Sequence, residues 1–132
     1  MRNEKLQKSL LIFSGVALIP IALSYGVVPE KTLTSLYGFP VENMNLTHIF
    51  RAQMGLCLGQ AIFYLLGAFQ ATLRRPAMWC LVVFMLGLAA GRAISLMIDG
   101  IPQFGLIFSL IAEIIMGFLG LSLLLRENKS LK

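Results

Sequence analysis

The stretch AMWCLVVFMLGLAAGRAISLMI, residues 77–98, decides the fold. It carries one charged residue, Arg92, over its whole length. A membrane helix needs about 20 mostly apolar residues to cross about 30 Å of hydrocarbon, so this stretch predicts a membrane span. Three other stretches are also mostly apolar and about as long, namely residues 9–28, 46–69 and 104–125. The sequence therefore predicts an all-α protein with four membrane-spanning helices, forming a single transmembrane domain over residues 1–132.

The composition agrees with a membrane protein. The 132 residues are 58% hydrophobic, whereas soluble domains are roughly 45–50% apolar. The net charge is +5, but the basic residues cluster at the ends of the apolar runs, which favours membrane lipids over nucleic acid as partners. Cys57 and Cys80 lie inside apolar stretches without the spacing of metal ligands, so we expect neither a metal nor a cofactor.

The distribution of basic residues predicts the orientation. The N-terminus, the Arg74-Arg75 pair and the C-terminus hold most of the lysines and arginines, and only Lys31 falls on the opposite side. Short loops rich in Lys and Arg stay in the cytoplasm. We therefore expect an antiparallel bundle with both termini cytoplasmic and a turn at Arg74-Arg75. The connection over residues 29–45 fits two interpretations, a segment lying flat along the lipid headgroups or an irregular surface loop.

Polar residues recur on one face of three predicted helices, as residues three, four or seven apart do. They are His48, Arg51, Arg92, Ser95, Asp99 and Glu113. Glycines accompany them, at 55 and 59, at 87 and 91, and at 117 and 120. Because small residues let helix backbones approach closely, we expect these side chains to point into the bundle. An unpaired charge at mid-bilayer costs on the order of 3 kcal/mol, so Arg51, Arg92 and Glu113 are expected to converge.

The polar face allows more than one interpretation. A buried ion pair can simply fix the register of two helices. The number of polar groups instead favours a pocket in the outer half of the membrane, which binds a lipid-like or small anionic molecule through arginine. Such a protein could also be an accessory subunit of a membrane system. The alternative is a homo-oligomeric, proton-coupled small-molecule transporter using Glu113. No Ser-His-Asp order, zinc motif or phosphate loop is present, so catalytic residues are unknown. An enzyme that uses His48 with Asp99 or Glu113 as base and acid is the least supported interpretation.

Several residues occur in a recognisable order. Arg51, then Gly91-Arg92, then Asp99-Gly100 with Pro102, and finally Glu113 follow one another along the chain. This order resembles a family of small bacterial four-helix membrane proteins of unknown function. The resemblance implies a multi-pass protein of the bacterial inner membrane and a role for Arg51, Arg92, Asp99 and Glu113, but it supplies no substrate. The chain is also distantly similar to DoxX-type membrane proteins, without the cysteine pair that would imply redox chemistry.

Overall fold

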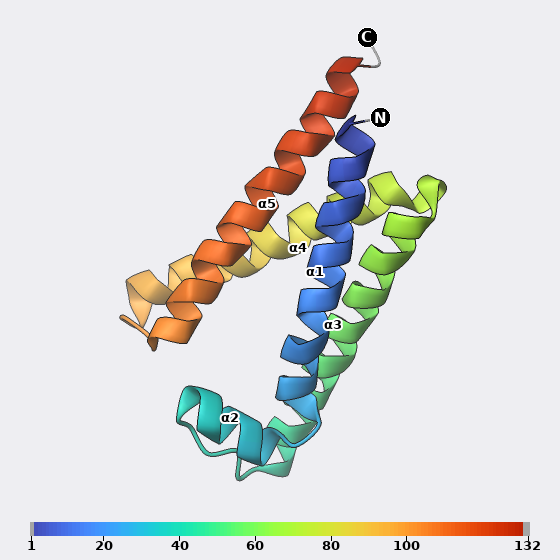
Figure 1. Ribbon diagram of the computed structural model, residues 1–132. Helices are drawn as coiled ribbons and strands as arrows, with labels where there is room; N and C mark the ends of the chain where they lie inside the picture. The colour runs from blue at the N-terminus through green and yellow to red at the C-terminus, as the bar shows by residue number, and fades with distance from the viewer. Residues whose placement is uncertain (1, 131–132) are drawn as a thin grey trace. The chain divides into compact units, whose positions relative to one another are not determined.

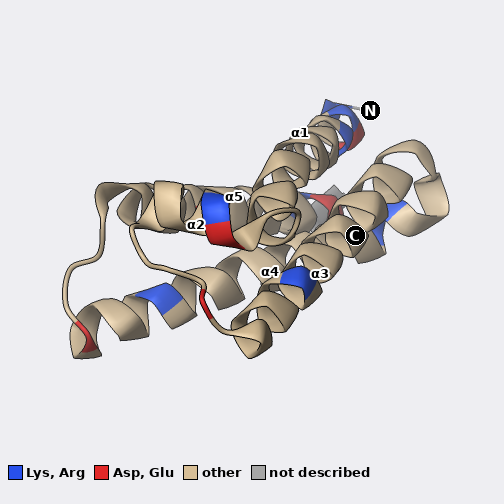
Figure 2. Ribbon diagram, turned by 90° about the horizontal axis from the view of Figure 1, so that it is seen from below, with Lys and Arg blue, Asp and Glu red and all other residues tan. Residues whose placement is uncertain are grey.

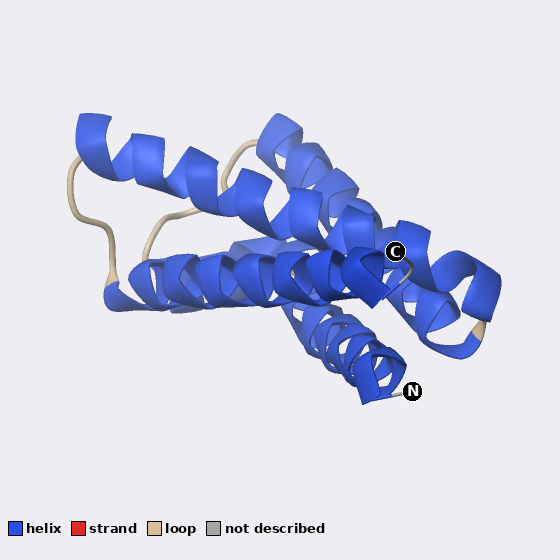
Figure 3. Ribbon diagram, turned by 90° about the horizontal axis from the view of Figure 1, so that it is seen from above, coloured by secondary structure: helices blue, strands red, loops and turns tan. Residues whose placement is uncertain are grey.

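A computed structural model describes residues 2–130 of the chain, and the side chains of residues 2–127. The described residues form helices and no strand (Figure 3). In chain order the helices are α1 (Arg2–Gly26), α2 (Pro29–Tyr37), α3 (Met44–Phe69), α4 (Ala71–Ile98) and α5 (Phe104–Ser130).

Four of these helices are long and apolar enough to cross a membrane, namely α1, α3, α4 and residues Phe104–Glu127 of α5. Figure 2 shows long stretches of these helices without a charged residue. The prediction of an all-helical protein with four candidate spans is confirmed, and the spans indicate a membrane protein.

Two helix ends differ from those expected. Helix α1 begins at Arg2, before the predicted start at residue 9. The chain turns at Gln70, whose backbone is extended, and α4 begins at Ala71. The predicted turn at Arg74-Arg75 is wrong, because these two residues lie within the first turns of α4. The apolar pattern marks where hydrocarbon can surround a helix, whereas the helical backbone continues into the charged flanks.

The connection between the first two candidate spans contains α2. Pro29 stands in its first turn, where a missing N–H removes no hydrogen bond. Gly38 ends the helix with a φ of 73°, and its N–H donates to the carbonyl oxygen of Thr34. The connection is therefore partly helical and not an irregular loop throughout, and its position along the headgroups stays a prediction.

The chain divides into two compact units, one of residues 12–65 and one formed by the remaining segments, up to residue 11 and from 66 onward. In the first unit, α1 and α3 lie side by side (Figure 1). Their contacts occur at glycines: a Cβ at Gly15 would lie 3.1 Å from the carbonyl oxygen of Ala61, and one at Gly26 would lie 3.2 Å from the Cα of Arg51. Side chains larger than hydrogen at these points would separate the two helices.

In the second unit, α4 packs against α5 and the start of α1 contributes buried residues. A Cβ at Gly117 would lie 2.5 Å from the Leu86 side chain, and one at Gly120 would lie 3.0 Å from Val82. At the other end of α5, Gln7 Nε2 donates to Glu127 Oε2 at 3.1 Å. The predicted close approach at Gly117 and Gly120 is therefore confirmed.

The other four glycines of the predicted polar face do not mark such contacts. A Cβ at Gly55, Gly59, Gly87 or Gly91 would meet no atom within 4 Å in the described chain, each unit being considered by itself. The expected close packing at these positions is therefore not found within either unit. Glycine spacing identifies a narrow helix face, but the side chains of the neighbouring helix decide whether that face is covered.

Candidate functional site

Arg92 and Glu113 form an ion pair between α4 and α5. Arg92 Nε lies 3.0 Å from both carboxylate oxygens of Glu113 and donates to them. The Glu113 side chain is 10% exposed and that of Arg92 is 27% exposed. The carboxylate is thus nearly enclosed, while part of the guanidinium remains accessible.

The packing of α4 and α5 brings the two charged groups together. Glu113 and Gly117 are four residues apart and share a face of α5. The absent side chain at Gly117 lets this face approach Leu86 of α4. This approach brings the Glu113 carboxylate within reach of the long Arg92 side chain.

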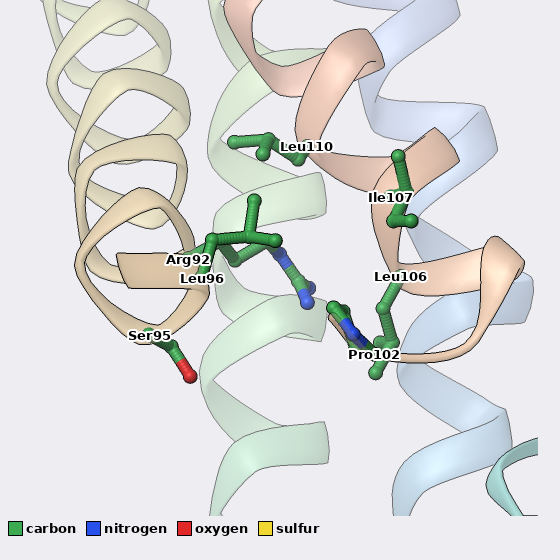
Figure 4. Close-up of a pocket in the computed structure, with 7 residues that line it drawn as sticks. All are labelled: Arg92, Ser95, Leu96, Pro102, Leu106, Ile107 and Leu110. Atoms are coloured by element: carbon green, nitrogen blue, oxygen red, sulfur yellow. The ribbon is translucent and has the colours of Figure 1, made fainter. Parts of the chain in front are cut away.

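A small cavity lies beside the ion pair and has a volume of about 80 Å³. Arg92, Ser95 and Leu96 of α4, Pro102 of the connection, and Leu106, Ile107 and Leu110 of α5 line it. Figure 4 shows Arg92 reaching from α4 towards α5, among the apolar side chains of the opposite wall. The cavity is therefore mostly apolar with one guanidinium at its edge.

The two terminal nitrogens of Arg92 are hydrogen-bond donors at the edge of this cavity that have no acceptor among the described residues. A guanidinium has five N–H donors, and only the one on Nε is directed to Glu113. Within the described residues, the two terminal nitrogens donate no hydrogen bond. An oxygen acceptor from outside the chain would satisfy them.

Ser95 and Asp99 form a separate hydrogen bond at the end of α4. Ser95 Oγ donates to Asp99 Oδ2 at 2.7 Å, and both residues are exposed. Asp99 is the C-cap of α4, and its N–H donates to the carbonyl oxygen of Ser95. The only ion pair of Arg92 within the described residues is with Glu113, so Arg92 turns to that carboxylate rather than to Asp99.

His48 and Arg51 lie on α3, in the other compact unit. Both are exposed, and neither side chain has a hydrogen bond or ion pair among the residues that the structure describes. Their inclusion in the pocket stays a prediction from the sequence. In the same described part of the chain, no three His, Cys, Asp or Glu side chains are grouped as a metal ion requires.

The apolar walls of the cavity were not among the residues predicted from the sequence. Leu106, Leu110 and Glu113 are spaced by four and three residues, which places them on one face of α5. That spacing alone could have grouped the leucines with the glutamate. The contribution of Pro102 had no comparable signal, because it depends on the path of the connection between α4 and α5.

No curated protein and no solved structure matches the chain. Residues 6–124 match a sequence family described as a domain of unknown function, DUF4345. This match covers the four candidate spans almost completely and includes every residue of the cavity beside Arg92. The chain therefore belongs to the DUF4345 family.

Proposed function

We propose that this protein is a multi-pass membrane protein that binds the phosphate or carboxylate head of a lipid-like or small anionic molecule at Arg92. One observation carries the proposal: the terminal nitrogens of a guanidinium held by Glu113 border an apolar cavity without a hydrogen-bond acceptor from the described chain. Unpaired donors are costly in an apolar region, and an anionic oxygen would remove that cost.

The size of the cavity favours a ligand of which only the head is enclosed. A volume of about 80 Å³ is small beside the roughly 300–1,000 Å³ of pockets that enclose a whole ligand. An apolar tail would have to continue outside the cavity. In a membrane, acyl chains surround the spans, so a lipid-like molecule fits better than a compact soluble one.

The ion pair also has a depth that suits this function. Arg92 precedes the end of α4 by six residues, a rise of about 9 Å at 1.5 Å per residue. Glu113 follows the start of α5 by nine residues, or about 14 Å. If both helices cross a hydrocarbon layer of about 30 Å, the guanidinium lies between the carboxylate and the nearer headgroups. A ligand could then reach Arg92 from one leaflet.

Orientation and location are further parts of the proposal. The distribution of lysines and arginines favours an antiparallel bundle with both termini in the cytoplasm, and the family resemblance noted from the sequence favours the bacterial inner membrane. Membrane lipids, a second copy of the chain or another membrane protein are the proposed partners. His48, Arg51, Ser95 and Asp99 stay proposed ligand contacts.

Native mass spectrometry of the purified protein tests the binding site. We expect wild-type protein to retain a bound lipid or small anion and Arg92→Ala to lose it. Arg126→Ala is the matched control, because Arg126 is an exposed arginine near the other end of α5. Leu106→Trp fills the cavity but leaves the ion pair, so it should also release the ligand. Unchanged occupancy in both Arg92→Ala and Leu106→Trp, with helix content kept, would contradict the proposal.

A further inference from the structure

Helix α2 is held across the ends of α1 and α3. Only Val27 and Val28 separate it from α1, a connection of about 10 Å at most. Thr32 Oγ1 donates to the carbonyl oxygen of Ser24 in the last turn of α1 at 2.6 Å. Leu33 is completely buried. Figure 1 shows α2 crossing the end of the α1–α3 pair rather than continuing either helix.

Four aromatic side chains join α2 to the same unit. Tyr25 of α1, Tyr37 of α2, Phe39 of the following connection and Phe50 of α3 form a closed cycle, which we call the aromatic cluster. Successive ring centroids lie 6.0 to 6.3 Å apart. Aromatic residues collect where a membrane protein passes from hydrocarbon to water. The cluster therefore marks the level of the α1 and α3 ends relative to a bilayer.

The apolar surface of this region is only partly covered by the chain. Leu36 is 53% exposed and Phe39, in the aromatic cluster, is 38% exposed. On the other side of α2, Glu30, Lys31 and Ser35 are exposed, and the two charges cancel. The helix is thus amphipathic and has no net charge.

We propose that α2 is an interfacial helix, which lies along the bilayer surface with Leu36 and the aromatic cluster at the boundary between headgroups and acyl chains. The inference rests on α1 and α3 spanning the bilayer, because a helix held across the ends of two spans is parallel to the membrane plane. The occupant of the exposed apolar surface is then the lipid interface itself. Since α2 is neutral, apolar contact and not attraction to anionic lipids holds it there.

Depth-dependent fluorescence quenching of the full chain in phosphatidylcholine vesicles tests this inference. Trp79, the single tryptophan of the chain, is first replaced by Phe. A tryptophan is then introduced by Leu36→Trp, or by the matched control Ser35→Trp on the polar side. We expect the Leu36→Trp probe to be quenched about threefold less by aqueous acrylamide than the Ser35→Trp probe. Phospholipids brominated near the headgroup should quench it more than those brominated near the acyl ends.

Three outcomes would overturn the inference. Equal acrylamide quenching of the two probes would place both sides of α2 in water. Stronger quenching by deeply brominated lipids would place α2 inside the hydrocarbon. Loss of protection when the protein is diluted in lipid would show that a second copy covers the surface. Phe39→Trp gives the same readout at the aromatic cluster if Leu36→Trp does not fold. The quenching of the Phe39→Trp probe is expected to stay unchanged when anionic lipid is added to the vesicles.

Discussion

Removing one member of the Arg92–Glu113 pair should destabilise the protein more than removing both. Arg92→Met strands a carboxylate that is only 10% exposed, and breaking a buried pair in this way costs about 3 kcal/mol. Glu113→Leu strands a guanidinium that is 27% exposed. A long arginine side chain can move its charge towards water, so the expected cost is smaller, about 1–2 kcal/mol. The double variant replaces both charges by apolar groups and is expected to lie within about 1 kcal/mol of wild type.

A double-mutant cycle measures this coupling. The free energy of unfolding is obtained for wild type, both single variants and the double variant in mixed detergent micelles. The expected coupling energy is about 3–5 kcal/mol, which is the summed cost of the two single variants less the cost of the double variant. Arg126→Met is the control for loss of an exposed arginine and should leave the unfolding midpoint unchanged. A coupling energy below about 0.5 kcal/mol would refute the argument that the two side chains share one site.

Three further predictions concern packing and function. Gly67→Ala should destabilise the protein by about 1–3 kcal/mol in the same unfolding assay, because the new Cβ would meet the Cβ of Ala77. Gly59→Ala on the same helix is the control and should be neutral or stabilising, because its Cβ would meet no atom within 4 Å. Leu33→Ala should lower the free energy of unfolding by about 2–5 kcal/mol, since Leu33 is completely buried. Limited proteolysis at residues 38–43 should also become faster. An unchanged cleavage rate would show that Leu33 does not hold α2. If the protein is a proton-coupled transporter, flux into proteoliposomes should follow a pH gradient and disappear in Glu113→Gln, while flux that ignores both would rule out this alternative.

The sequence by itself was sufficient for the candidate spans, because an apolar run long enough to cross a bilayer is a local property of the chain. It also indicated that Arg92 and Glu113 would need each other, since a lone charge in such a run is costly. The start of α4 could not be predicted from the apolar pattern, because the helical backbone extends through Arg74 and Arg75 into a region that this pattern does not cover.

Tertiary structure decided which groups meet. The spacing of Gly87 and Gly91 resembles that of Gly117 and Gly120, yet only the second pair receives side chains from a neighbouring helix of its unit. Arg92 turns to Glu113 rather than Asp99 because α5 approaches α4 at Gly117, and the same approach forms the cavity. Such contacts join residues distant in sequence, so helical periodicity can identify the face on which a residue lies but not the side chain that faces it.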